Sequence, residues 1–500
     1  MQQPMMSLWL LWSGLILFII TMIAIGLVAR RYAKATLEDF FLGGRRLGVV
    51  LAFFTTYATL FSAFSYFGVT GAYYTHGIGV YGWCADIALL SLLIYVFGSR
   101  LRAWGRKFGY ICTGDMLADR YQSKVLAGLA SIVFVIAIVP YVGAQLRGSG
   151  VLLEGFSQQA IPYWVGVVFM SAIIAVYVSF GGFRGVVWTD FVQGVTMMAI
   201  LSVAMVIIVY KAAGGFGPLM TKIANQRPEL LSLPGPKGVY NLRLTSSIII
   251  MFGLCNFTLP WMVQRYYALK SARTLKYLAV IFTIGTMFIF IPNYYIAMAG
   301  RVYFPQLAAP ETVYPMLISA LVPTGIALIA LIGMLAATGS TANSLVLTCS
   351  SILVNDLYLN CFSHVREISQ KVVTNVSRLL ISLVIIAAIL VSFFGPPTIV
   401  GLVLNVAWPL MFQVFPTIAA ALFWKRATAT ACIISIFVGE AIVLAIRLKW
   451  MPALFGLHMG LVGGIFAAIT LIIVSLITKP LPEEHLKKFF DMFERPRVSG

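Results

Sequence analysis

Long apolar runs separated by short polar segments dominate this chain. Runs of about 20 residues, the length that crosses a bilayer as a helix, occur thirteen times. The predicted spans are residues 7–29, 50–72, 78–99, 125–146, 161–180, 186–210, 245–264, 277–299, 322–351, 374–394, 397–423, 427–446 and 456–478. This pattern predicts an all-α polytopic membrane protein whose helices are joined by short loops.

Two of the predicted spans carry polar and helix-breaking residues at their middle. ATLFSAFSYFGVTG (58–71) mixes small and hydroxyl residues, and FGLCNFTLPWM (252–262) contains Gly, Asn, Thr and Pro. Broken helices at matching places in two halves of a chain indicate a transporter site, because unwound backbone is tolerated in a membrane only where it lines a cavity. Gly and Pro are also common in ordinary membrane helices. The matched pair, five spans apart, predicts two breaks beside a binding site.

The ninth span is rich in oxygen atoms. Eight of the sixteen residues from Ala336 to Ser351 carry a hydroxyl or an amide. Helical spacing places Ala337, Ser340, Thr341 and Ser344 on one face. These hydroxyls could bond carbonyls of their own helix or of its neighbours, or they could bind a small hard cation. The spacing alone leaves both interpretations open.

Charge fixes the class and predicts the topology. Of the 500 residues, 60% are hydrophobic and 10% are charged, against about 25% charged in a soluble domain. Of the 35 Lys and Arg, 26 lie on one predicted side, 8 on the other and one, Arg147, within a span. By the positive-inside rule the N-terminus lies outside and the C-terminus in the cytoplasm of a cell (inner) membrane. The net charge of +19 therefore reflects topology, and no nucleic-acid partner is expected.

Three separated motifs resemble those of one family. GGFRGVVWTDFVQ (181–193) resembles the signature of the sodium/solute symporter family, FFLGGRRLG (40–48) its entry to the first core helix, and GSTANSLVLTCSSILVNDLY (339–358) its sodium-binding helix. DMLADRYQSKVLAGLAS, SFGGFRG, ILVNDLYLN and FGLH are most similar to the sodium/pantothenate symporter branch.

This resemblance implies a leucine-transporter-like fold of two inverted five-helix repeats. The implied divisions are an extra N-terminal helix (7–29), a first repeat (50–210), an external loop (211–243), a second repeat (245–423), two C-terminal helices (427–478) and a cytoplasmic tail (479–500). The thirteen predicted spans fit this plan without adjustment.

The resemblance also implies a sodium ion as the coupling ion. Its oxygen ligands would come from Ala58, Phe61, Ala337, Ser340 and Thr341. Some family members carry an acid just before the position of Phe61, and Leu60 stands there instead. An acid-assisted site of that kind is therefore absent. The sequence shows no second sodium site, so one sodium per turnover is expected. Asp190 of the WTD motif is predicted to lie on the sodium exit path, with helix capping or an ion pair with Arg184 as the alternative.

The substrate site is less well defined by sequence. Arg147, near the external end of the fourth span, could bind a substrate carboxylate, pair with Asp86 or reach the interface. Further candidates to bind the substrate are Thr56, Ser62, Ser65, Gln145, Asn256 and Thr258. Tyr66 and Phe257 could be walls or gates of the site, or plain core residues.

The sequence therefore predicts a monomeric, bilayer-embedded carrier that couples sodium to uptake of a small organic acid by alternating access. Pantothenate or a similar carboxylate is the first choice, and a monocarboxylate such as pyruvate, lactate or acetate, or an amino acid, is the alternative. A membrane sensor with a transporter-like core is the alternative outside transport. Four scattered histidines and no paired catalytic carboxylates indicate that the protein is not an enzyme.

Overall fold

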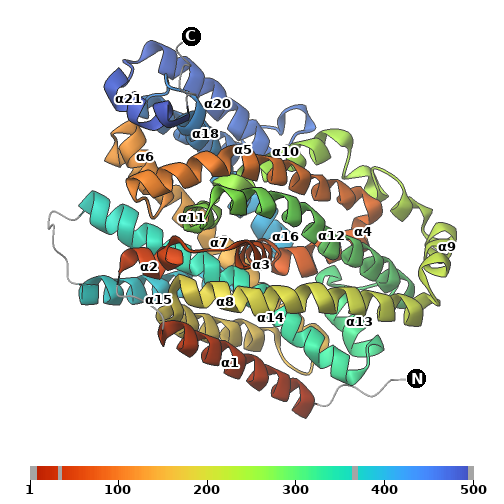
Figure 1. The fold of residues 1–500 in the computed structure, drawn as a ribbon. Coiled ribbons are helices and arrows are strands. Elements are labelled where there is room, and N and C mark those ends of the chain that lie inside the picture. The colour runs from red at the N-terminus through yellow and green to blue at the C-terminus, as the bar shows by residue number, and fades with distance from the viewer. Residues whose placement is uncertain (1–7, 32–35, 363–369, 494–500) are drawn as a thin grey trace, which may run out of the picture.

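The computed structural model describes residues 8–31, 36–362 and 370–493. Its helices cover the chain almost without interruption (Figure 1). They are α1 Leu8–Arg31, α2 Leu37–Leu42, α3 Val49–Leu60, α4 Val69–His76, α5 Ala85–Phe108, α6 Thr113–Tyr121, α7 Lys124–Phe156, α8 Tyr163–Ala213, α9 Phe216–Gln226, α10 Leu242–Thr258, α11 Pro260–Ala268, α12 Ala272–Tyr303, α13 Val313–Leu321, α14 Thr324–Ser351, α15 Gln370–Phe394, α16 Ile399–Leu402, α17 Trp408–Phe412, α18 Phe415–Phe423, α19 Ala429–Arg447, α20 Met459–Ile477 and α21 Glu483–Phe490.

Each of the thirteen predicted spans coincides with helix. Within the described residues, nine helices are long and apolar enough to cross a membrane, and eleven spans result if each of two bent pairs is one span. The two remaining predicted spans correspond to α5, which has four basic residues near its end, and to the first part of α8, whose apolar stretch Tyr163–Val176 is shorter. A kink at Gly182, with φ of 52°, separates the two parts of α8.

Both predicted breaks are confirmed. The helices Val49–Leu60 and Phe64–Gly82 meet at 59°, and Leu242–Thr258 and Pro260–Ala268 meet at 47°. Proline at the start of α11 cannot continue the ladder of α10. The two broken segments are also tied together at one end, because Leu47 donates to the Ala268 carbonyl at 3.0 Å and Lys270 donates to the Leu47 carbonyl at 2.9 Å.

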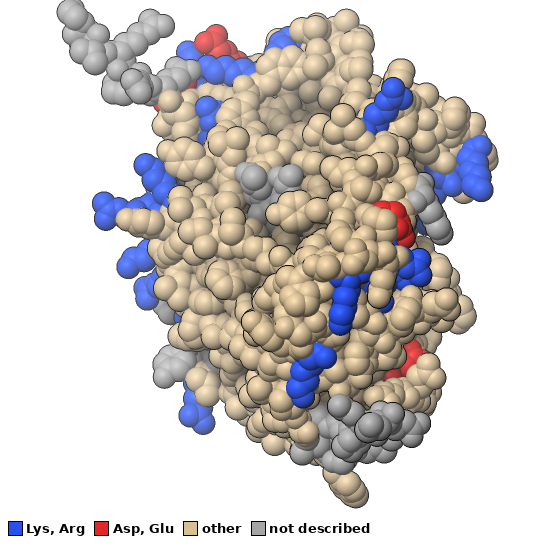
Figure 2. Space-filling view, turned by 90° about the vertical axis from the view of Figure 1, so that its right-hand side faces the viewer, with Lys and Arg blue, Asp and Glu red and all other residues tan. Residues whose placement is uncertain are grey.

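The remaining helices surround these broken segments. The long helix α14 packs against α7, α8 and α3, which places its polar face beside the first break. The last helices, α18, α20 and α21, gather at the opposite end of the molecule from α1 (Figure 1). The face that carries α9 is mostly uncharged, with Lys and Arg in separate groups rather than in one continuous field (Figure 2).

Candidate functional site

The first break exposes the carbonyl end of α3 inside the protein. Helix α3 ends at Leu60, and Phe61 leaves the helix with an extended backbone, φ −92° and ψ 102°. The last carbonyls of a helix have no partner within it, so buried ones need hydrogen-bond donors or a cation. The break packs closely against α7. A Cβ on Gly148 of α7 would lie only 2.3 Å from the Cβ of Ala63, so a larger residue would displace the break.

Two hydroxyls of α14 meet these carbonyls. Ser340 Oγ donates to the Ala58 carbonyl at 2.6 Å. Thr341 Oγ1 donates to the Thr59 carbonyl at 2.9 Å and lies 3.3 Å from that of Ala58. We call this group, Ala58, Thr59, Ser340 and Thr341, the hydroxyl layer. All four residues are fully buried.

The hydroxyl layer brings together most of the sodium ligands that the resemblance implies. The Ala337 carbonyl lies 3.5 Å from Ser340 Oγ, and Phe61 is the first residue past the end of α3. The oxygens are carbonyls and hydroxyls, without a carboxylate, which is a donor set that suits a hard cation of low charge. A hydroxyl can turn its proton away and offer a lone pair. The residues present therefore fit a sodium ion.

A second polar layer lies directly beside the first and contains opposite charges. Arg265 Nη2 lies 3.3 Å from Asp190 Oδ2 and donates to Ser344 Oγ at 2.9 Å. It also donates to the hydroxyls of Thr55 and Thr59. Thr55 in turn donates to Asp190 at 2.6 Å. We call Thr55, Asp190, Arg265 and Ser344 the charged layer, and Thr59 joins it to the hydroxyl layer.

This arrangement corrects two expectations about charge. Arg184 does not pair with Asp190, because it makes three hydrogen bonds to Asp39 at 2.6–3.0 Å. Arg265 directly follows the predicted span 245–264 and is one of the 26 basic residues on the predicted cytoplasmic side, yet its side chain is only 2% exposed. The helix that restarts at Pro260 carries Arg265 inwards. The sequence signal for this buried position was a basic residue that closely follows a predicted break.

Three of the predicted substrate residues gather at the restart of the first broken helix. Gln145 Oε1 accepts a hydrogen bond from the Ala63 N–H at 2.9 Å, and Ser62 Oγ accepts one from Phe64 N–H at 3.1 Å. Ser65 Oγ lies 3.4 Å from the Ser62 N–H. Sequence reasoning missed Asn293 of α12, whose Nδ2 donates to the Ser65 carbonyl at 2.6 Å. Its position after Pro292, within an apolar span, was the only hint.

Three further predicted substrate residues lie at the second break and on α3. Asn256 and Thr258 end α10 at the second break, where Thr258 donates to the Cys255 carbonyl at 2.8 Å. Thr56 is fully buried, and its hydroxyl has no hydrogen-bond partner among the described residues. Aromatic rings connect the two breaks, since Phe64 stacks on Phe252.

The two aromatic candidates have different surroundings. Phe257 packs against Phe97 and Phe415 at ring distances of 4.2 and 5.5 Å, which is a contact within the core. Tyr66 stacks on Tyr314 with an angle of 6° between the rings, and its buried hydroxyl has no partner among the described residues. Tyr66 therefore retains the features of a wall or gate better than Phe257.

Arg147 on α7 is bound to backbone carbonyls. Its Nη1 donates to the Pro397 carbonyl at 2.6 Å, and its Nη2 donates to the Ser392 carbonyl. These bonds hold the connection between α15 and α16. The side chain of Asp86 lies outside the part of the chain that the structure describes, so the predicted pair between Asp86 and Arg147 stays a prediction.

Comparisons with known proteins place the chain among characterised carriers. It is 29% identical to the sodium/pantothenate symporter of Escherichia coli (strain K12), over 85% of this chain and 88% of the relative. It is 30% identical to the high-affinity proline transporter PutP of Bacillus subtilis (strain 168), over 85% and 89%. A solved structure of a Na+-coupled sialic acid symporter in a substrate-bound outward-open state superposes with a TM-score of 0.80 at 21% identity, covering 94% of this chain and 98% of that one.

The fold and the broken helices define an all-helical, multi-span membrane protein with the predicted leucine-transporter-like fold. The chain belongs to the sodium:solute symporter family, whose model matches residues 40–439. It is therefore a sodium-coupled symporter of a small solute and not an enzyme. The predicted family is confirmed.

Proposed function

We propose that this protein takes up a small organic acid together with one sodium ion, by alternating access, and that pantothenate or a similar carboxylate is the substrate. The observation that carries the sodium part is the hydroxyl layer. Ser340 and Thr341 converge on the carbonyls that the break of α3 leaves open. Sodium would bind these carbonyl and hydroxyl oxygens in place of the hydrogen bonds between them, and it would hold α3 against α14.

The sodium ligands in this proposal are the oxygens of Ala58, Phe61, Ala337, Ser340 and Thr341. Sodium that leaves towards the predicted cytoplasmic side would next meet the charged layer. Asp190 can bind the sodium ion only as the Arg265 guanidinium withdraws, because the guanidinium now occupies the hydroxyls around the Asp190 carboxylate. Asp190 is in this way part of the exit path, and Arg265 closes it.

A carboxylate substrate is supported by chemistry common to the relatives. Pantothenate, proline and sialic acid, the solutes named for the relatives, all carry a carboxylate. The restart of the broken helix at Ala63 offers N–H groups that Gln145 and Ser62 now occupy. The N-terminal end of a half-helix attracts an anionic group. We therefore place the carboxylate there, with Ser65, Asn256, Thr258 and Thr56 around the rest of the substrate.

An amino acid such as proline is the second candidate, because the Bacillus subtilis relative is a proline transporter. A zwitterion also needs an acceptor for its ammonium group. The proposed substrate set consists of hydroxyls, amides and Arg147, and it contains no carboxylate. This favours a simple acid over an amino acid. Arg147 is kept as a more distant carboxylate ligand that would have to leave the Ser392 and Pro397 carbonyls.

Membrane potential separates the proposed stoichiometry from others. One positive charge that enters at about −100 mV contributes about 2.3 kcal/mol. If one sodium moves with one monovalent carboxylate, the two voltage contributions cancel. The rate of acid uptake would then depend on the sodium gradient. It would not change when a potassium diffusion potential is imposed across the membrane.

The decisive experiment is uptake into proteoliposomes with an inward sodium gradient. Labelled pantothenate, pyruvate, lactate, acetate and proline are offered in sodium and in potassium. We expect sodium-dependent uptake of one acid, and its loss in the double variant Ser340→Ala with Thr341→Ala. Ser350→Ala is the matched control, because this hydroxyl on the same helix is fully buried and has no partner among the described residues. Uptake of proline alone would refute the simple-acid proposal, and equal uptake in the double variant would refute the sodium site.

A further inference from the structure

Two glycine pairs that are far apart in the sequence meet at the predicted cytoplasmic boundary of the membrane. Gly43 and Gly44 follow α2 with φ of 60° and 70°, and Gly182 marks the kink of α8 with φ of 52°. A Cβ on Gly182 would lie 3.1 Å from the Phe40 carbonyl. A Cβ on Gly44 would lie 3.2 Å from Asp39 Oδ1. These glycines allow the turn after α2 to pack onto the kink, and transport as proposed above does not require them.

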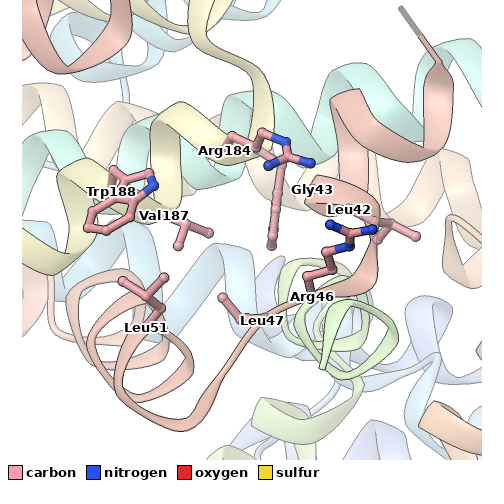
Figure 3. A pocket seen from close by; sticks show the side chains of 9 residues that line it. Leu42, Gly43, Arg46, Leu47, Leu51, Arg184, Val187 and Trp188 are labelled. Carbon is pink, nitrogen blue, oxygen red and sulfur yellow. The ribbon is translucent and has the colours of Figure 1, made fainter. Parts of the chain in front are cut away.

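A pocket lies between this turn and α8. It has a volume of about 90 Å³. Its lining includes Leu42, Arg46, Leu47, Leu51, Arg184 and Trp188. In Figure 3 the guanidinium groups of Arg46 and Arg184 lie at one end, and Leu51 and Trp188 lie at the other. The pocket therefore has a cationic end and an apolar end.

The cationic end has arginine N–H groups that are available to an anion. Arg184 is fixed by Asp39, to which it donates from its Nε and Nη2 atoms. Its Nη1 group makes no hydrogen bond to any residue that the structure describes. Arg46 is exposed and forms no ion pair or hydrogen bond with the described part of the chain. Asp39 offsets one positive charge, so Arg46 supplies the net charge of this end.

The apolar end faces the lipid. Trp188 is 50% exposed, and the apolar span that begins at Gly182 continues from it. Exposed Trp at the end of a span is typical of the interface between headgroups and acyl chains. The pocket is too small for a whole lipid. It has room for a headgroup phosphate, while the acyl chains would run over Leu51 and Trp188 outside it.

We propose that this pocket binds the phosphate of an anionic phospholipid, with Arg46 and Arg184 as its ligands and Trp188 beside the acyl chains. A planar guanidinium matches two phosphate oxygens. Basic pockets between membrane helices on this side of a membrane recognise lipid headgroups. The bound lipid would join the segment before α3 to the kink of α8.

Native mass spectrometry of the full-length protein in mild detergent tests this proposal independently of transport. Phosphatidylglycerol and phosphatidylcholine are added separately to the wild type and to Arg46→Gln. We expect retention of phosphatidylglycerol by the wild type, a loss of about fivefold or more in Arg46→Gln, and partial recovery in Arg46→Lys. The matched control is Arg273→Gln, an exposed arginine at the start of α12 on the same predicted side. An equal loss in both glutamine variants, or no preference for phosphatidylglycerol, would overturn the site.

A second arm distinguishes a lipid from free phosphate. Trp188→Ala removes the apolar wall and leaves both arginines in place. We expect this variant to retain less phosphatidylglycerol, and we expect an excess of inorganic phosphate to displace little of the lipid from the wild type. Full displacement by phosphate together with unchanged binding in Trp188→Ala would show a site for a free anion and would overturn the lipid assignment.

Discussion

The hydroxyl layer and the charged layer are neighbours on α14, yet their buried polar atoms have different kinds of partner. In the hydroxyl layer, neutral side chains of Ser340 and Thr341 satisfy neutral carbonyls. In the charged layer, Oδ2 of the Asp190 carboxylate meets the Arg265 guanidinium and Thr55, while the buried Oδ1 has no hydrogen-bond partner among the described residues. Thr59 contributes its carbonyl to the first layer and its hydroxyl to the second.

The difference shows where a mobile cation can bind. The charged layer already contains a cation of its own, so a sodium ion would compete with a covalently attached guanidinium. The hydroxyl layer has oxygens without a resident charge. The comparison therefore supports the proposal that sodium binds in the hydroxyl layer and that the charged layer closes the path.

The largest effect is expected from removing the guanidinium. Arg265→Met leaves the Asp190 carboxylate buried without its partner, and loss of one member of a buried pair costs about 3–5 kcal/mol. Thermal unfolding of the purified protein measures this loss. The double variant Arg265→Met with Asp190→Asn should recover much of it. A single variant as stable as the wild type would mean that the pair does not stabilise the closed path.

The residue that joins the layers is expected to have the next largest effect. Thr59→Val removes the hydroxyl and keeps the carbonyl. Hydrogen bonds to charged groups contribute about 1.5–3 kcal/mol each, so stability should fall by about 2 kcal/mol. The sodium concentration for half-maximal uptake should change less than about threefold, or about 0.7 kcal/mol, because the variant keeps the Thr59 carbonyl that faces Thr341. A large change in sodium dependence would show that the two layers act as one site.

The hydroxyl layer should show the opposite pattern. Ser340→Ala removes one proposed ligand without leaving a buried charge. The sodium concentration for half-maximal uptake should rise about tenfold, which corresponds to about 1.4 kcal/mol, with a smaller loss of stability than in Thr59→Val. Ser350→Ala on the same helix should leave sodium dependence unchanged. If both variants behave alike, the hydroxyls of α14 only satisfy neighbouring groups.

A carboxylate outside both layers tests the importance of a guanidinium partner through the pH dependence of stability. Glu311 lies in the turn Pro310–Thr312 and accepts a hydrogen bond from the Ile399 N–H at 2.8 Å. Burial raises the pKa of Glu311 to about 7, against opposing effects of the backbone N–H groups and Arg147. The folded state therefore favours its protonated form. Its contribution to stability is full below the unfolded pKa, near 4.5, and is lost as the pH rises through about 7.

The corresponding measurement is thermal unfolding at several pH values. Between about pH 4.5 and 7, the wild type should lose stability relative to Glu311→Gln, which does not titrate. Glu229→Gln, at an exposed glutamate whose side chain is 45% exposed, serves as the control and should retain the wild-type pH dependence. Parallel curves for the wild type and Glu311→Gln would contradict the assignment.

Much of the fold was accessible from the sequence because its signals are local. A span is predicted by length and hydropathy, and a break by Pro260 or by polar residues within an apolar run. The shared helix face of Ser340 and Thr341 follows from helical periodicity alone. The bilayer strengthens these signals, because it forces each backbone polar group to find a partner within helices or buried protein.

The pairing of charges was not accessible in the same way. The sequence predicted functional importance for Asp190 and Arg147, but only the packing of α3 against both α8 and α11 decided that Asp190 meets Arg265. The packing of α2 against α8 assigned Arg184 to Asp39, and the packing of α12 against α3 brought Asn293 to the first break. Hydrogen bonds and ion pairs act over a few ångströms, and their partners here are separated by 75 to 228 residues. The sequence by itself determined the spans, the breaks and the oxygen-rich face. The tertiary structure alone decided which oxygen, carboxylate and guanidinium share each layer, because that depends on how separate helices pack.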